Sequence, residues 1–272
     1  MAKDILNVLA ELQAKGEPYA VATVVETTGS VSAKISSKAV VDQDGRVVSG
    51  WIGGGCAESI TCDTALKSMV SGEPRMIDID LDSDMLGKGM PCGGKMRVYV
   101  EPVLPKPSMW IIGHGRVAES LCIMADLVGL NVIVIDPDVE WEQYPNASRL
   151  IIDDSKLEQL KPGKDDYLVI ATQAKDDHEM MSTVLATEAH YIALIASRKR
   201  SRLVQDYLRK EGYKDSDLQR VMMPSGLDLG ARLPEEIALC VISEITMLRR
   251  GGTGMRMRDK LQLEAVQTKA AG

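Results

Sequence analysis

Two cysteines of this chain stand beside runs of glycine, an arrangement suited to sulfur chemistry. The first, Cys56, follows three consecutive glycines, which are Gly53, Gly54 and Gly55. Because glycine loses more conformational freedom on folding than other residues, such a run indicates a tight turn or a close approach to another group. A helical pattern starts after it, and the amide groups at a helix N-terminus bind anions and favour the thiolate form of cysteine. The run therefore predicts a reactive Cys56 beside an anionic ligand, and the alternative is a strand-to-helix turn around an inert thiol.

Cys92 stands in a second glycine-rich loop and is followed by Gly93 and Gly94. Neither loop is specific by itself. Together they indicate two loops with accessible backbone that present thiols to one ligand. The alternative is two unrelated loops whose thiols are incidental.

A dinucleotide-binding pattern begins at Gly113. Together with Gly115 and Ala118 it forms Gly-x-Gly-x-x-Ala, between a predicted strand at 109–112 and a predicted helix at 117–127. The glycines permit a tight turn and a close phosphate approach, and the alanine permits contact between helix and strand. The next predicted strand ends at Asp136, close to the spacing of about 20 residues expected for an acid that binds a ribose.

Three further apolar segments are predicted strands, and two helical segments lie among them. The strands are 148–152, 167–172 and 190–195, and the helices are 177–186 and 201–211. Parallel strands with crossover helices are the simplest account, and ligands bind beyond the carboxyl ends of such strands. Ser197 and Arg198 follow the last strand and are expected to hold a phosphate at a helix N-terminus. The basic residues after them, Lys199, Arg200 and Arg202, are expected to form a solvated surface.

The chain is predicted to divide at a proline-rich connector. Residues 101–107 contain three prolines, which block regular strand pairing. We therefore expect an α/β protein in which an N-terminal mixed α/β domain, 1–104, is followed by a Rossmann-like parallel-sheet domain, 105–250. Residues 251–272 are polar and are expected to form a mobile tail.

Composition excludes several classes of protein. A net charge of -7 argues against a nucleic-acid partner, and no apolar run is long enough to span a membrane. The first residues lack the apolar core of a signal peptide. Five cysteines are an odd count, which argues against a disulfide framework, and the absence of a Cys-x-x-Cys pair argues against structural zinc. A cytoplasmic protein is expected.

Taken together, the motifs resemble the XdhC/CoxI family, accessory proteins that mature molybdenum hydroxylases such as xanthine dehydrogenase and carbon monoxide dehydrogenase. The resemblance extends over roughly residues 5–248. The matching segments are 28–30, 53–58, 92–94, 100–102, 113–118, 197–198 and 224–236, the last of which contains the pattern GLD-x-GAR-x-PEE.

The resemblance implies a maturation chaperone rather than a classical enzyme. Such a protein binds molybdenum cofactor (molybdopterin in its cytosine-dinucleotide form), protects it during sulfuration by a cysteine desulfurase, and delivers it to the large subunit of an apo molybdenum hydroxylase. It implies that Cys56 and Cys92 contact molybdenum or carry sulfur, and that Glu58 orders the loop or relays a proton. The implied cofactor-binding residues are Gly53, Gly54, Gly55, Gly93, Gly94, Gly113, Gly115, Ala118, Asp136, Ser197, Arg198 and Asp228. A homodimer is expected.

Some positions depart from the family pattern. Residues 31–37 lack the expected Pro-Arg and glycine, Ala196 replaces a glycine, and residues 173–178 are altered. These changes leave the ligand contacts and the client enzyme open. An NAD-dependent oxidoreductase and a nucleotide-sensing regulatory module remain alternatives, although the sequence shows no clear proton-transfer pair for hydride chemistry.

Overall fold

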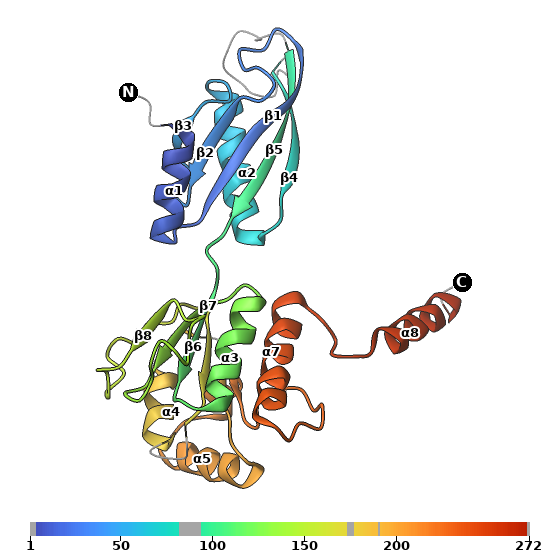
Figure 1. Cartoon of the computed structure of the whole chain (residues 1–272). Helices are drawn as coiled ribbons and strands as arrows, with labels where there is room; N and C mark the ends of the chain where they lie inside the picture. Colours follow the sequence, from blue (N-terminus) through green and yellow to red (C-terminus); the bar gives the residue numbers. More distant parts are fainter. Residues whose placement is uncertain (1–3, 82–93, 173–176, 190, 271–272) are drawn as a thin grey trace. The chain divides into compact units, whose positions relative to one another are not determined.

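The computed structural model describes residues 4–81, 94–172, 177–189 and 191–270. The chain folds into two compact units, residues 1–106 and 107–272 (Figure 1). The first contains an antiparallel sheet with helices and the second a parallel sheet with helices. This confirms the predicted fold class.

The N-terminal unit is built on a five-stranded sheet in the order β3-β2-β1-β5-β4, in which every neighbouring pair is antiparallel. Its elements are α1 (Ile5–Lys15), β1 (Tyr19–Gly29), β2 (Lys38–Asp42), β3 (Val47–Gly50), α2 (Cys56–Ser71), β4 (Arg75–Asp80) and β5 (Gly94–Val103).

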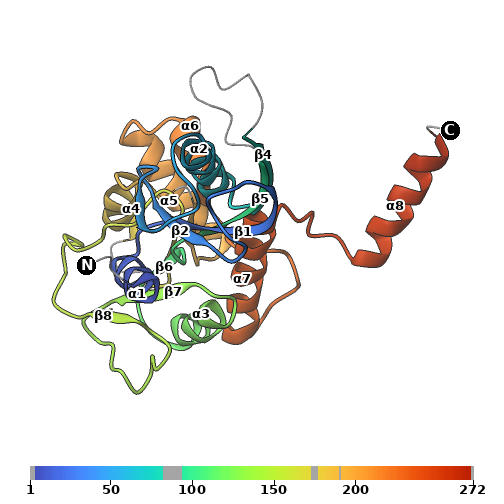
Figure 2. The ribbon, with the colours of Figure 1, turned by 90° about the horizontal axis from the view of Figure 1, so that it is seen from above.

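The two helices of this unit cover opposite faces of the sheet (Figures 1 and 2). Side chains alternate along β1, so neighbouring residues of this strand pack against different helices. Ala20 and Ala22 are buried in the core that includes Ala57 and Ala65 of α2. The neighbouring Tyr19 instead packs in the cluster that contains buried residues of α1. The sheet thus fixes the start of α2, where the predicted thiol lies.

The C-terminal unit is built on a six-stranded parallel sheet in the order β11-β10-β9-β6-β7-β8. Its elements are β6 (Ser108–Ile112), α3 (Arg116–Leu127), β7 (Asn131–Ile135), β8 (Arg149–Ile151), β9 (Tyr167–Ile170), α4 (Asp177–Leu185), β10 (Tyr191–Leu194), α5 (Arg198–Lys210), α6 (Asp215–Leu218), β11 (Val221–Met222), α7 (Pro234–Arg250) and α8 (Met257–Ala270). The strand order reverses between β6 and β9, and ligands of such sheets bind at this reversal, beyond the carboxyl ends of the strands.

Both faces of the parallel sheet are covered by helices. Met109 and Ile111 of β6 belong to the core that includes α3 and α7, whereas Trp110 and Ile112 belong to the core that includes α4 and α5. A strand buried on both faces has no polar alternation, which is why β6 reads as a continuous apolar run.

One helix starts earlier than its apolar periodicity predicts. The helix predicted from 201 begins at Arg198, because the Ser197 hydroxyl accepts a hydrogen bond from the Arg200 amide at 3.3 Å. Helix α7 begins at Pro234, a residue suited to a first helical turn. The tail expected to be mobile contains α8. Within the described part of the chain, no helix is long and apolar enough to cross a membrane.

Candidate functional site: two glycine-lined turns

In the N-terminal unit, the candidate site lies in the turn that joins β3 to α2. Gly50 has φ +80°, and a Cβ there would lie 2.1 Å from the carbonyl oxygen of Lys38 on β2. Gly53 has φ +118°, and its Cβ would lie 3.3 Å from that of Ala57. These two glycines are therefore required by the packing of the turn itself.

Gly54 and Gly55 differ, since no atom lies within 4 Å of a Cβ built at either position. Gly55 is the N-cap of α2, with φ 55° and ψ -109°. Cys56, the first helical residue, is exposed, and Glu58 lies in the first turn. The first amide groups of a helix have no acceptor within it. The turn thus combines an exposed thiol, backbone donors and open space, as a site for an anionic ligand requires.

The second glycine-rich loop lies largely outside the described residues, and Cys92 and Gly93 are among the residues that are not described. Gly94 is the first residue of β5 and pairs with Gly29. A Cβ at Gly94 would lie 2.7 Å from Cγ2 of Val31 and 2.8 Å from the carbonyl oxygen of Thr28. Strand packing is therefore sufficient to explain this glycine.

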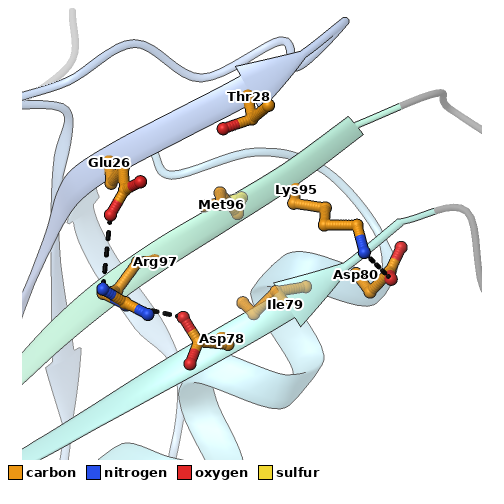
Figure 3. Close-up of a pocket in the computed structure, with 8 residues that line it drawn as sticks. All are labelled: Glu26, Thr28, Asp78, Ile79, Asp80, Lys95, Met96 and Arg97. Atoms are coloured by element: carbon orange, nitrogen blue, oxygen red, sulfur yellow. Dashed lines mark hydrogen bonds and ion pairs between the residues drawn. The ribbon is translucent and has the colours of Figure 1, made fainter.

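A hollow of about 320 Å³ lies on the sheet face formed by β1, β5 and β4 (Figure 3). Arg97 crosses it, 3.3 Å from Glu26 and 2.6 Å from Asp78, and the ammonium of Lys95 lies 2.8 Å from Asp80. These side chains are largely exposed, so each pair contributes little to stability. The hollow is a charged surface whose basic groups already face acids.

In the C-terminal unit, the candidate site lies where β6 ends. Gly113 has φ +118°, and a Cβ there would lie 2.6 Å from the carbonyl oxygen of Ala171, so β6 and β9 need glycine at this point. Gly115 is the N-cap of α3, with φ 97° and ψ -178°, and nothing lies within 4 Å of its Cβ position. Ala118 is fully buried in the core between helix and sheet. The loop leaves open space at Gly115, where a Cβ would obstruct a ligand.

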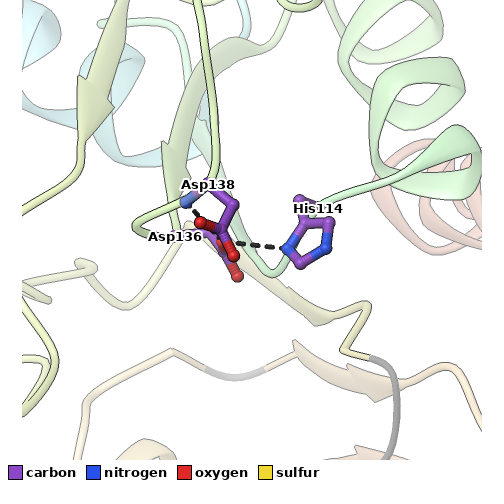
Figure 4. A group of neighbouring side chains, drawn as sticks. All are labelled: His114, Asp136 and Asp138. Atoms are coloured by element: carbon purple, nitrogen blue, oxygen red, sulfur yellow. Dashed lines mark hydrogen bonds and ion pairs between the residues drawn. The ribbon is translucent and has the colours of Figure 1, made fainter.

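Asp136, which follows β7, is held from two sides (Figure 4). Its Oδ1 lies 2.9 Å from Nδ1 of His114 and accepts a hydrogen bond from the Asp138 amide at 2.9 Å. Ligand atoms of these three residues lie within 4.8 Å of one another, a group that could hold a metal ion. Sequence reasoning missed His114 and Asp138, although His114 is the middle residue of Gly-x-Gly and Asp138 stands two residues after the predicted acid.

Tyr144 anchors the same loop through its hydroxyl. Its side chain is fully buried, and the hydroxyl accepts a hydrogen bond from the Gly115 amide at 3.1 Å. Burial raises the pKa of Tyr144 to about 12, and the nearby Glu119 and Asp136 add to this against the opposing effect of the Gly115 amide. One backbone donor of the loop is therefore already occupied by the protein.

Replacing Tyr144 with phenylalanine should lower the free energy of unfolding by about 1 kcal/mol, because the Gly115 amide loses its acceptor while the ring still packs. The raised pKa means that the hydroxyl contributes fully below the ordinary tyrosine pKa of about 10 and loses its contribution only as the pH rises towards the folded-state value. Urea unfolding should give the same difference at about pH 6 and about pH 9. A difference that grows across this interval would contradict the assignment.

The start of α5 brings basic groups to the carboxyl end of the sheet. Ser197 caps the helix and Arg198 is exposed at its first residue. Arg200, expected on a solvated surface, instead donates to the carbonyl and the hydroxyl oxygens of Thr172, at 3.4 and 3.1 Å, beyond the end of β9. The expectation for Arg200 was wrong, because this side chain is only partly exposed and binds Thr172 beyond the end of β9.

Asp228 is exposed on the loop between β11 and α7. The loop is fixed by Glu244, whose Oε2 accepts hydrogen bonds from the Gly226 amide at 3.0 Å and from the Tyr191 hydroxyl at 2.7 Å. Burial, followed by the charge of Glu244, raises the pKa of Tyr191. The N-termini of α3 and α7 are joined nearby by an ion pair of 2.6 Å between Arg116 and Glu235.

The predicted site residues thus form two groups, one in each unit. The N-terminal group is Gly53, Gly54, Gly55, Cys56, Glu58 and Gly94, and the C-terminal group is Gly113, Gly115, Ala118, Asp136, Ser197, Arg198 and Asp228. That thiols of the first group act on a ligand held by the second stays a prediction.

Comparison with known proteins identifies the family from both units. The family described as "XdhC Rossmann domain" matches residues 109–245, which is half of the chain. The family described as "XdhC and CoxI family" matches residues 12–80. The first match covers the parallel sheet from β6 to α7, and the second includes the turn that carries Cys56.

Three similar proteins lie at low sequence identity. Uncharacterized protein YqeB of Escherichia coli (strain K12) is 28% identical over 260 residues, which are 92% of this chain and 47% of that protein. A probable xanthine dehydrogenase subunit of Bacillus subtilis (strain 168) is 27% identical over 163 residues, 56% of this chain and 46% of that protein. A crystal structure described as a xanthine dehydrogenase from Bacillus halodurans is 22% identical, with a TM-score of 0.49, over 92% of this chain and 96% of its own. This chain spans about half the length of the two curated relatives, and with both of its units matched it belongs to the XdhC and CoxI family.

Proposed function

We propose that this protein is an accessory factor that binds molybdenum cofactor in its cytosine-dinucleotide form, protects it during sulfuration and delivers it to an apo molybdenum hydroxylase. The observation that carries the proposal is the turn at Cys56, where an exposed thiol begins α2 and the Cβ positions of Gly54 and Gly55 face open space. The naming of a family relative as a probable xanthine dehydrogenase subunit supports a molybdenum hydroxylase as the client.

The residues of the C-terminal turn are of the kinds that suit the nucleotide part of such a ligand. The open space at Gly115 and the acid Asp136 suit the nucleotide, and the first turn of α5, with Ser197 and Arg198, suits a phosphate. Cys56 and Cys92 are the proposed sources of thiolate ligands for the metal. When bound, the cofactor supplies the metal centre that receives a terminal sulfur. The role of this chain is to bind the cofactor, shield it from water and offer thiolate ligands.

Sulfur delivery would need a cysteine desulfurase as a partner, and release would need the large subunit of the hydroxylase. A homodimer and a cytoplasmic location belong to the same proposal. The free thiols of Cys56, Cys62, Cys122 and Cys240 support the cytoplasmic location.

Binding of NAD by an oxidoreductase is the second candidate. The pair formed by His114 and Asp136 favours it, because an imidazole beside a carboxylate is a common proton-transfer group. This pair lies where the nucleotide is expected, however, and not at a separate substrate pocket in the described residues. We therefore place the chaperone first.

Anaerobic purification from cells that make molybdopterin tests the choice. We expect the wild type to carry pterin, identified by mass and fluorescence, and Cys56→Ser to lose it by roughly tenfold or more, because a hydroxyl is a poor ligand for molybdenum. Cys92→Ser should behave similarly.

Cys62→Ser is the matched control, since Cys62 lies on the same helix and is only partly exposed. Its pterin content should stay near that of the wild type. Bound NAD with a hydride-transfer rate that neither Cys56→Ser nor Cys92→Ser changes would favour the oxidoreductase instead.

A further inference from the structure

The carboxylate of Asp136 is engaged through one oxygen. Both of its side-chain hydrogen bonds, with Nδ1 of His114 and from the amide of Asp138, end on Oδ1 at 2.9 Å. Among the described residues, no hydrogen bond or ion pair reaches Oδ2. Because an ionised carboxylate only accepts, Nδ1 of His114 carries the hydrogen of this bond. Two donors therefore fix the carboxylate and leave its second oxygen as an acceptor.

In folds of this type, an acid at the position of Asp136 hydrogen-bonds the ribose of the nucleotide. Asp136 follows β7, which neighbours β6 in the sheet, and its partner His114 stands between the two glycines of the phosphate loop. The side chain of Asp136 is only 15% exposed. A shielded acceptor that lacks a partner gains more from a ligand hydroxyl than one in full contact with water.

The charge around Asp136 limits which ribose fits. Residues 136–148 contain four acids, namely Asp136, Asp138, Glu140 and Glu142, and no lysine or arginine. A 2′-phosphate would bring nearly two further negative charges and is normally held by an arginine at this point of the fold. This segment offers no such group, so a phosphorylated ribose would meet repulsion from its carboxylates.

We propose that His114 is a positioning residue that orients Asp136 to accept hydrogen bonds from a ribose with free hydroxyls, and that the crevice thereby selects nucleotides without a 2′-phosphate. The inference rests on the proposed nucleotide-binding role of this unit and narrows its ligand class. It concerns the middle residue of the Gly-x-Gly turn, whose side chain reaches back to the acid across the end of two strands (Figure 4).

Calorimetric titration of the full chain in the presence of EDTA tests this. The probes are CDP, 2′-deoxy-CDP, NAD and NADP. We expect CDP to bind roughly tenfold more tightly than its 2′-deoxy analogue, and NAD more tightly than NADP by a similar factor. Equal affinities within each pair would overturn the inference, although binding itself would still support the proposed function. A wild type that binds none of the four would overturn both.

Two variants isolate His114. His114→Leu removes the donor and should weaken CDP binding by roughly tenfold while leaving 2′-deoxy-CDP unchanged. His114→Asn places an amide nitrogen near the position of Nδ1 and should restore most of the ribose preference. A role in folding alone would instead weaken both ligands equally, and so would contradict the inference. If His114→Leu does not fold, His114→Ala also removes the donor and gives the same test: loss of the preference for CDP over 2′-deoxy-CDP supports the inference, and an unchanged preference overturns it.

A divalent cation held by His114, Asp136 and Asp138 is the competing explanation for this cluster. It predicts that EDTA abolishes nucleotide binding, that Mg²⁺ restores it, and that Asp138→Asn weakens CDP and 2′-deoxy-CDP alike. That result would overturn the assignment of Oδ2 to a ribose hydroxyl. Binding that is unchanged by EDTA and by Asp138→Asn would support it.

Discussion

Replacing Gly50 with alanine should destabilise the N-terminal unit by roughly 3 kcal/mol or more. A residue with a side chain is strained at φ +80°, and the new Cβ would lie 2.1 Å from the carbonyl oxygen of Lys38. That oxygen cannot easily move away, since it accepts a hydrogen bond from the Trp51 amide at 2.7 Å. The clash is between backbone groups of β2 and β3, so no side chain can rotate to relieve it.

Circular dichroism during urea unfolding of the full chain measures this effect, with each transition fitted separately because the protein has two units. We expect the transition of the N-terminal unit to move and that of the C-terminal unit to stay. Gly54→Ala is the matched control in the same turn, since Gly54 has no positive φ and nothing lies within 4 Å of its Cβ position.

Gly54→Ala should therefore change stability by less than about 0.5 kcal/mol. Under the proposed function it should still reduce bound pterin, because its methyl group would enter the open space beside Cys56. Equal stability of the Gly50 and Gly54 variants would show that the turn is not constrained as the structure indicates. Full pterin binding by Gly54→Ala would instead place the ligand elsewhere.

Local patterns predicted the fold and the positions of both turns. Gly53 and Gly55 before Cys56, and the Gly-x-Gly at Gly113, mark backbone conformations that few other residues adopt, so they can be recognised in the sequence. The apolar runs of the parallel strands can be recognised too, because a strand covered on both faces tolerates few polar residues.

The partners that hold each turn could not be predicted in this way. Tyr144 reaches the Gly115 amide from 29 residues away, and Glu244 joins Tyr191 to Gly226 across more than one element. Such contacts depend on which strands become neighbours and on the register between them. Gly50 shows the same limit, since the need for glycine arises from the pairing of β2 with β3 and not from any nearby motif.

Replacing Arg220 with methionine should destabilise the C-terminal unit by about 3 kcal/mol, or roughly 10 °C in Tm. The half-buried guanidinium donates to the carbonyl oxygens of Thr187 at 2.8 Å and Ala189 at 2.7 Å, and also to that of Leu185 at the end of α4. Methionine keeps much of the apolar stem but removes all three donors. The carbonyl of Arg220 accepts a hydrogen bond from the Ile192 amide at 3.0 Å, so losing the guanidinium contacts should also weaken the pairing of β10 with β11.

Thermal unfolding of matched variants separates this effect from the loss of any arginine. Arg209 pairs with Asp215 at 3.3 Å, but both side chains are more than half exposed, so Arg209→Met should cost less than about 1 kcal/mol. Arg220→Lys should fall between the two, because an ammonium cannot match the planar fork of the guanidinium at three carbonyls. Equal Tm values for Arg220→Met and Arg209→Met would mean that water replaces the missing donors. The end of α4 would then be held by the packing of its buried residues Met181 and Val184 against the sheet.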